Sequence, residues 1–413
     1  MGNDPIHKDA PPPDHPGFHP YPYVVTVLLA PEEERYYPPK TLQVYTDNAD
    51  SAYRLVMEQG VERLGDYGGT TRSRAGRGLQ LGVATLLAAY KGLFLHEEGH
   101  AVALRQVGCR ADVDFTLMGV GSTATSEYCE EDYDYDGNEF YRGSMKFLSE
   151  SFRKSAFTTA AGINATQYAT QRIALRMQSG ASYTDIPPYL LHKVDHSLSI
   201  RVAGIIDGGN DVDNYWNNMW GMIHPYAYPG SPYNNFPGEL EPPFDWKTLN
   251  RAAFWNIADP WIWYLTFKGG EYVWSGEENF RVPNFLPRTE AYLTTAGPIF
   301  QAVVPFCFDR FCFSPYVRRT LNHNPGPLGQ TWGSGIERAG ARFGPLMVGV
   351  GGDYWNSNGA RGGAARFDAM VRLFRPFDNL FAGIETACKT EGPLPGYSDD
   401  KSWQLLGKFG FEL

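Results

Sequence analysis

The hydrophobic pattern of the chain changes near residue 280. Before that point, apolar residues recur at helical spacing in three long segments, and a helix is predicted for each. These segments are 78–107, 144–180 and 186–203. Strand-like runs precede them at Tyr23–Leu29 and Leu42–Tyr45. The region 207–260 is rich in aromatic residues, proline and asparagine without a clear period, so we expect long loops that cover a site.

After residue 280 the period becomes two. In Arg366–Phe374 apolar residues occupy every odd position, whereas two arginines and an aspartate occupy even positions. The last run, Trp403–Leu413, repeats this alternation. A strand shows this pattern when one of its faces meets an apolar environment and the other meets water. Further strands are predicted at 289–306, 313–321, 338–354 and 379–388.

One predicted helix carries a metal-binding motif. His96-Glu97-Glu98-Gly99-His100 is a complete H-E-x-x-H within an apolar, proline-free run that predicts a buried helix. Histidines four apart lie on one helix face and can bind one metal ion. Zinc accepts two imidazoles and one oxygen ligand and leaves a position for water, from which Glu97 is placed to take a proton. The motif therefore predicts a zinc site with Glu97 as catalytic base; a solvated polar stripe without a role is the alternative.

This helix resembles the active-site helix of the site-2 protease family of zinc metallopeptidases, on the motif His96-Glu-x-Gly-His100 and the glycine at 108. Ala160-Ala-Gly-Ile-Asn164 resembles the second motif of that family, and Ile206-Asp-Gly-Gly209 resembles its aspartate motif. The resemblance implies that His96, His100 and Asp207 hold zinc and that Asn164 orients substrate. It covers the middle third of the chain. The chain departs from the family because membrane-spanning helices of about 20 apolar residues are not evident.

Other residues remain open as metal ligands. Glu150 lies on the next predicted helix and is a second candidate for the third ligand. His192 and His196 are also four apart, but no acid accompanies them as Glu97 accompanies the first pair, and surface histidines of a polar helix are the preferred interpretation.

The alternating strand at the end of the chain resembles the closing strand of bacterial outer-membrane β-barrels, although it ends in Leu413 rather than Phe or Trp. The resemblance implies a barrel whose outer face meets outer-membrane lipid and a location in the cell envelope, at the outer membrane or in the periplasm. A soluble antiparallel sheet packed on the helices is the alternative. No apolar run precedes residue 17, so no signal peptide is expected in the chain as given.

Composition adds limits on partners and on the compartment. The formal net charge of −10 argues against a nucleic-acid partner. Of the five cysteines, Cys307 and Cys312 can bridge the arms of a turn, and Cys109 and Cys129 bracket one segment, which leaves Cys388 over. Two such disulfides would indicate an oxidising compartment, whereas five free thiols are the alternative.

Together these patterns predict an α+β chain in which a helical zincin-like domain is followed by an antiparallel β-barrel or β-sheet region. The expected divisions are a flexible tail at 1–20, a strand-containing segment at 21–75, a helical metallopeptidase-like domain at 76–280 and the barrel or sheet at 281–413.

Two functions follow from these predictions. The first is zinc-dependent hydrolysis of a protein or peptide substrate at the outer membrane. The second is a barrel with a structural, transport or assembly role and an inactive H-E-x-x-H helix.

Overall fold

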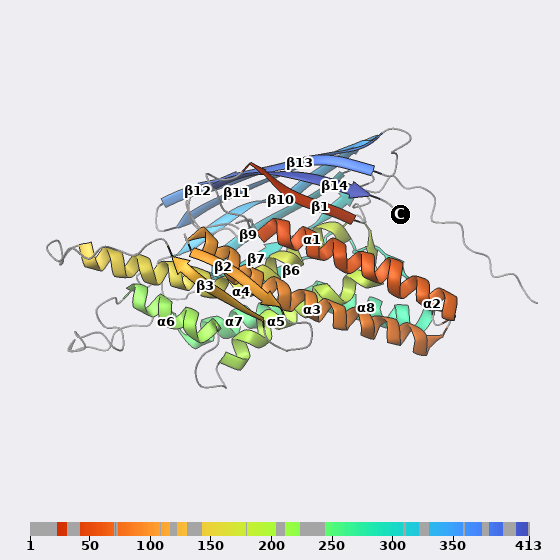
Figure 1. Ribbon diagram of the computed structural model, residues 1–413, viewed down its shortest axis with the longest axis horizontal. Coiled ribbons are helices and arrows are strands. Elements are labelled where there is room, and N and C mark those ends of the chain that lie inside the picture. The colour runs from red at the N-terminus through yellow and green to blue at the C-terminus, as the bar shows by residue number, and fades with distance from the viewer. Residues whose placement is uncertain are drawn as a thin grey trace, which may run out of the picture.

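The computed structural model of the protein describes a large part of the chain. The described residues are 23–30, 42–69, 71, 73–107, 109–115, 122–129, 143–178, 180–203, 211–223, 244–308, 311–321, 330–357, 360–373, 380–390 and 402–411. They form helices and one large antiparallel sheet, which confirms the α+β prediction. In Figure 1 the sheet lies along one side of the molecule and the helices along the other.

Two long helices of the helical layer pack against each other. They are α3 (Arg74–Gln106) and α4 (Gly143–Met177), and with α5 (Ile186–Ala203) they correspond to the three predicted helical segments. The N-cap residue Ser73 starts α3, because its side chain accepts a hydrogen bond from the Gly76 backbone N–H. The other helical elements are α1 (Leu42–Leu55), the π-helix η1 (Val56–Glu62), α2 (Arg63–Gly68), the short 3-10 helix η3 (Tyr183–Asp185), α6 (Asp211–Ile223), α7 (Trp246–Ile257) and α8 (Pro260–Ser275).

Two predictions for the part of the chain before residue 280 were wrong. In the described part of the region 207–260, helices α6 and α7 take the place of the predicted loops, whereas 207–210 and 224–243 lie outside the described residues. Asp245 caps the start of α7 at the backbone N–H of Thr248, a start signal that a period count misses. The run Leu42–Tyr45 begins helix α1 rather than a strand. Over a longer window the buried residues Leu42, Thr46 and Tyr53 follow helical spacing.

The sheet has ten strands, in the order β1-β14-β13-β12-β11-β10-β9-β7-β6, with β8 paired to β9. The first described strand, β1, therefore pairs with the last, β14, with Val25 opposite Phe409. The strands are β1 (Tyr23–Ala30), β6 (Arg288–Thr294), β7 (Gly297–Val303), β8 (Phe306–Phe308), β9 (Phe311–Thr320), β10 (Thr331–Phe343), β11 (Leu346–Ser357), β12 (Ala360–Arg372), β13 (Leu380–Lys389) and β14 (Ser402–Phe411). Two small antiparallel pairs lie outside this sheet: β2 (Cys109–Phe115) with β3 (Ser122–Cys129), and β4 (Ala181–Ser182) with β5 (Asn279–Phe280).

Two segments predicted as single strands are hairpins. The run 338–354 is divided between β10 and β11 by a turn in which Gly344 has a φ of +61°, a conformation that favours glycine. The run 289–306 is divided in the same way between β6 and β7. The predicted disulfide between Cys307 and Cys312 is confirmed and joins β8 to β9. Cys109 and Cys129 are partners in the register of β2 and β3, but their side chains lie outside the described part.

Helix side chains cover the first edge of the sheet, at β1. The Ser51 hydroxyl accepts a hydrogen bond from the backbone N–H of Val24 (2.8 Å) and donates one to its carbonyl (2.7 Å). One turn earlier on α1, the amide of Asn48 pairs in the same way with the backbone of Thr26 (2.8 and 3.1 Å). The side chains of α1 thus occupy the positions in which a further strand would pair with β1.

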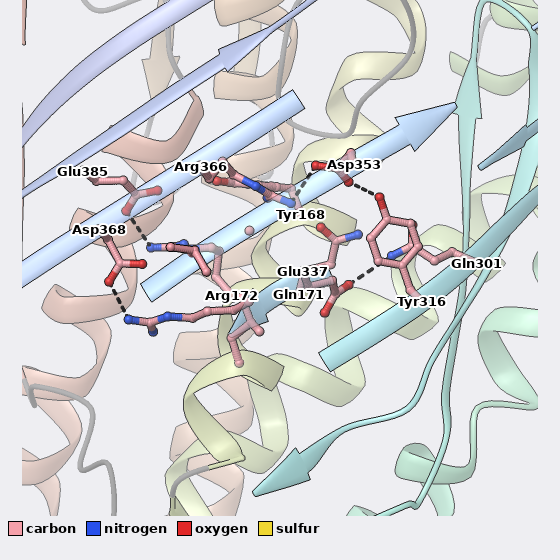
Figure 2. A pocket seen from close by; sticks show the side chains of 14 residues that line it. Tyr168, Gln171, Arg172, Gln301, Tyr316, Glu337, Asp353, Arg366, Asp368 and Glu385 are labelled. Atoms are coloured by element: carbon pink, nitrogen blue, oxygen red, sulfur yellow. Dashed lines mark hydrogen bonds and ion pairs between the residues drawn. The ribbon is translucent and has the colours of Figure 1, made fainter. Parts of the chain in front are cut away.

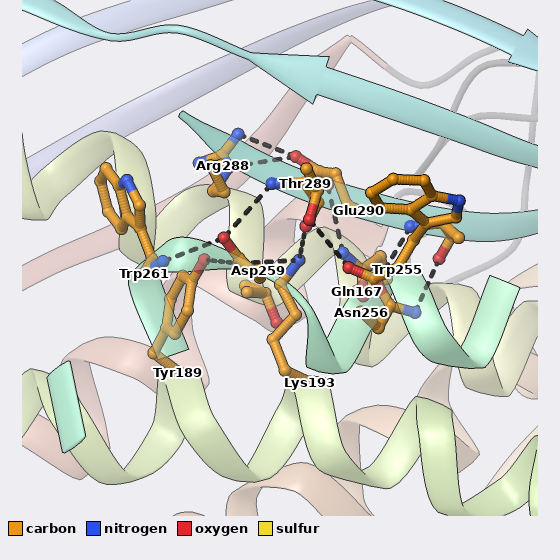
Figure 3. Close-up of polar contacts among 12 residues, drawn as sticks. Gln167, Tyr189, Lys193, Trp255, Asn256, Asp259, Trp261, Arg288, Thr289 and Glu290 are labelled. Carbon is orange, nitrogen blue, oxygen red and sulfur yellow. Dashed lines mark hydrogen bonds and ion pairs between the residues drawn. The ribbon is translucent and has the colours of Figure 1, made fainter. Parts of the chain in front are cut away.

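The opposite edge, β6, is covered by the same device (Figure 3). Asn256 of α7 accepts from the N–H of Ala291 (2.9 Å) and donates to its carbonyl (3.2 Å), and Asn164 of α4 pairs with Leu293 (3.0 and 2.5 Å). At Thr289 the N–H donates to Asp259 (3.2 Å) and the carbonyl accepts from Lys193 (2.5 Å). The described strands therefore form an open sheet, and no pairing between β1 and β6 closes it into a barrel.

Charged side chains fill the space between the sheet and α4. Arg172 of α4 bonds Asp47 (3.0 Å), and Lys408 of β14 pairs with Glu385 of β13. A cavity lined by polar side chains of α4 and the strands lies in this layer, and Figure 2 shows the ion pairs around it. The side of the sheet that faces the helices is thus the polar side.

Candidate metal centre

Helix α3 presents both histidines of the motif on one face. Their Nε2 atoms lie 3.3 Å apart, and the side chains of His96 and His100 keep 17% and 14% of their surface exposed. The two side chains are thus mostly buried but keep some contact with water. Glu97 is half-buried next to it, whereas Glu98 points to the interior and pairs with Arg105 (3.3 Å).

Helix α4 can approach these histidines closely because residue 162 is glycine. A Cβ atom at Gly162 would lie 2.3 Å from Nε2 of His100 and 2.8 Å from Nε2 of His96, well inside van der Waals contact. Gly99 on α3 allows the same approach from the other side, since a Cβ there would lie 2.5 Å from the Ala161 carbonyl oxygen. The two glycines let the helix backbones meet, and no Cβ atom of Gly162 stands against the imidazole nitrogens.

The carboxylate at the site comes from Asp211, the first residue of α6. Its Oδ2 atom lies 2.8 Å from Nε2 of His96 and 3.1 Å from Nε2 of His100. Burial raises the pKa of this carboxyl, but hydrogen bonds from His100 and His96 lower it by more, so the pKa lies well below its usual range. Asp211 is therefore ionised at neutral pH.

The outer nitrogens of both imidazoles also have neighbours. Nδ1 of His100 bonds the carbonyl oxygen of Thr158 on α4 (2.8 Å), which orients the ring with Nε2 toward Asp211. Nδ1 of His96 lies 4.0 Å from Oδ2 of Asp195 on α5. Burial raises the pKa of the Asp195 carboxyl, against the opposite effect of His96. Backbone and carboxylate partners of this kind fix the orientation of metal-binding histidines in known sites.

The donor set suits zinc by geometry and by chemistry. One atom from each of His96, His100 and Asp211 lies within 4.8 Å of the others, and the closest separations are 2.8, 3.1 and 3.3 Å. Ligand atoms bound tetrahedrally at about 2.0–2.1 Å from one ion lie roughly 3.3 Å apart. Two imidazoles and one carboxylate are a known catalytic zinc set, and they leave a coordination position for water.

The structure brings together only part of the predicted site. His96, Glu97 and His100 lie as expected on one helix. Asp207, predicted as the third ligand, lies outside the described residues, as does the side chain of Glu150. Asn164 is on α4, two residues after Gly162, and its amide is engaged with the backbone of Leu293. Its predicted role in binding substrate remains a prediction.

Sequence reasoning missed Asp211 and interpreted His192 wrongly. The acid residues of Asp211-Val-Asp213 before an apolar period are a signal for a helix start and were available in the sequence. His192 is 1% exposed rather than on the surface, and neither of its ring nitrogens has a hydrogen-bond partner in the described part of the chain. The side chain of His196 lies outside the described residues.

Comparisons of this chain with family models, with curated proteins and with solved structures find no match. The resemblances to site-2 proteases and to outer-membrane barrels therefore rest on the motifs of the sequence alone.

Proposed function

We propose that the protein is a zinc-dependent peptidase that hydrolyses peptide bonds of a protein or peptide substrate. The observation that carries the proposal is the convergence of His96, His100 and Asp211 beside Glu97. The H-E-x-x-H motif predicts two ligands and a base, and Asp211 supplies the oxygen ligand that the motif itself lacks. Gly162 gives further support, because it keeps this space open where any other residue would fill it.

Each residue then has a distinct role. His96, His100 and Asp211 would hold the zinc ion, which when bound lowers the pKa of water and polarises the substrate carbonyl. The carboxylate of Glu97 takes a proton from the attacking water and delivers it to the leaving amine. The carbonyl oxygen of Thr158 orients the imidazole of His100 through Nδ1. The side chains of His96, His100 and Asp211 keep 17%, 14% and 32% of their surface exposed, so water can reach the site.

Hydrolysis of quenched fluorescent peptides by the full-length, zinc-loaded protein tests the proposal. We expect the wild type to cleave part of a mixed peptide set and Glu97→Gln to lose at least about 100-fold in rate, because general acid–base catalysis contributes that much. Glu277→Gln, at an exposed position after α8, is the matched control and should cleave at the wild-type rate.

Two results would count against the peptidase. Wild-type rates in Glu97→Gln would show that the cleavage does not use this site. Absence of cleavage by zinc-loaded wild type over the whole peptide set would favour the other predicted function, in which the sheet has a structural or transport role.

A further inference from the structure

The large sheet has its polar side turned inward and its apolar side turned outward. We call the side of β1 and β9–β14 that faces away from α4 the outer sheet face. In the middle of these strands it carries large apolar side chains that are 37–61% exposed. Examples are Val27, Val317, Val350, Phe367 and Ile384. The neighbouring positions on the same strands point inward and include Asp353, Arg366 and Glu385. A protein surrounded only by water has the opposite arrangement.

Charged residues on the outer sheet face are confined to one row at one end. In the described part of these strands they are Arg319 and Arg361. The strand register places Arg319 beside Trp332, Trp332 beside Asn356 and Asn356 beside Arg361, so the four residues form a row across β9–β12. Tryptophan and arginine in one row are typical of the boundary between a bilayer and water.

The apolar band has the height of a bilayer core. On β10 the outward residues run from Trp332 in this row to Phe343 at the other end. A register shift between Ile336 and Ala339 takes up one residue, so the two ends of this run are ten ladder steps apart, as Asn356 and Leu346 are on β11. Ten steps correspond to about 34 Å along a strand, or roughly 26 Å in height at the strand tilt of about 40° found in membrane sheets. The hydrocarbon core of a bilayer is about 25–30 Å thick, measured perpendicular to the membrane plane.

Backbone groups at both edges of the sheet have hydrogen-bond partners within the protein, as a water-free environment requires. A backbone group without a partner costs several kcal/mol in hydrocarbon, which is why open sheet edges are not found there. Here the side chains of α1 cover the β1 edge, and side chains of α4, α5 and α7 with Asp259 cover the β6 edge. An open sheet can therefore lie against lipid without a closed barrel.

The helical side of the molecule also carries exposed apolar surface. Helix α3 is long and apolar enough to cross a membrane, and only 28% of its most apolar 18-residue window is buried, where the core helix of a soluble protein would be mostly buried. Trp263, Phe267 and Trp274 on α8 are 64–68% exposed. These helices lie on the side of the molecule away from the outer sheet face (Figure 1). A single protein partner docked on the sheet would leave them uncovered, whereas a bilayer surrounds all sides.

We propose that the outer sheet face contacts the hydrocarbon core of a lipid bilayer, with the row Arg319–Trp332–Asn356–Arg361 at the headgroups. The charges between the sheet and α4 then form a polar interior shielded from lipid. This inference does not depend on zinc or on peptide hydrolysis.

Two substitutions on the same strand and the same face test the proposal. Val350 lies in the middle of the apolar band on β11, and Asn356 lies in the boundary row. Full-length protein refolded from detergent into phosphatidylcholine–phosphatidylglycerol vesicles is separated by flotation, and its partition coefficient is measured. We expect Val350→Lys to lower the coefficient about 30-fold or more and Asn356→Lys to lower it less than about fivefold, because the cost of lysine depends on depth.

A second measurement covers the case in which Val350→Lys fails to fold. Wild-type protein and Trp332→Phe are placed in vesicles of phosphatidylcholine brominated either near the headgroup or near the end of the acyl chain. The fluorescence assigned to Trp332 by difference should be quenched more by the shallow bromines. A wild type that forms a stable dimer in buffer and does not float with vesicles would overturn the proposal, as would equal losses in both lysine variants that keep their fold.

Discussion

Gly162 sets the distance between α4 and the two histidines of α3. Its backbone lies where a side chain would overlap both Nε2 atoms, and the rings cannot move aside freely. His100 is held at Nδ1 by Thr158 and at Nε2 by Asp211, so displacement of the ring would break a hydrogen bond at either end. The site therefore depends on a residue that has no chemistry of its own.

Substitution of Gly162 tests whether zinc binding needs the close approach of α4 to the two histidines. We expect Gly162→Ala to lower zinc affinity at least about tenfold, as loss of ligand orientation typically does. The measurement is calorimetric titration with zinc. Gly82→Ala on the exposed face of α3 is the control, since a Cβ there meets nothing within 4 Å, and it should bind zinc like the wild type. Unchanged affinity in Gly162→Ala would show that the histidines do not need this space.

At the scale of single residues, the sequence predicted the part of the candidate site that lies on one helix. His96, Glu97 and His100 could be predicted because one helical turn determines their geometry. Asp211 comes from a helix 111 residues later, and its approach depends on how α6 packs on α4, which no short motif encodes. The choice of Asp207 followed a motif, whereas the position of Asp211 follows from tertiary packing.

Among the elements, strand β6 depends most on side chains from other elements. At the edge of the sheet, the backbone groups of Thr289, Ala291 and Leu293 pair with helix side chains in place of a neighbouring strand. Asn256 is fully buried, so water cannot replace its amide. Buried backbone groups left without partners cost about 1–3 kcal/mol each.

Removal of this amide should destabilise the protein strongly. We expect Asn256→Ala to lower the free energy of unfolding by about 2–5 kcal/mol, because it leaves the N–H and carbonyl of Ala291 unpaired. Asn284 is a matched control: it pairs in the same way with the backbone of Cys307, at 2.8 Å for both bonds, but it is exposed. Asn284→Ala should cost less than about 1 kcal/mol in a denaturant titration, since water takes over both bonds. Equal losses would refute the role assigned to burial.

Elements with a long, clear period were predicted well, and elements defined by caps and turns were not. Helices α3, α4 and α5 and strands β12 and β14 follow their patterns. Helix α7 was missed because its start depends on Asp245, and β10 and β11 were merged because the turn at Gly344 does not interrupt the alternation. Short-range chemistry, rather than hydrophobicity, decides these boundaries.

In the whole molecule, the first and the last described strands complete one sheet, and the helices lie along one side of it. Strand β1 pairs with β14, so the predicted N-terminal segment and C-terminal region share one element. The α+β class followed from the two hydrophobic periods. The open form of the sheet could not be predicted, because it depends on amides and hydroxyls of α1, α4 and α7 that meet strand edges far away in the sequence. The alternation of the strands alone is equally compatible with a closed barrel.

The zinc content and zinc affinity of four purified proteins test the central claim most directly. These are the wild type, His96→Ala, Asp211→Asn and Asp207→Asn, analysed by elemental mass spectrometry and by competition with a chelator. We expect about one zinc per chain in the wild type, the number for a single site with three protein ligands, and an affinity loss of at least about 100-fold in His96→Ala and in Asp211→Asn, with Asp207→Asn unchanged. Loss of zinc in Asp207→Asn with retention in Asp211→Asn, or a wild type that binds no zinc, would contradict the account.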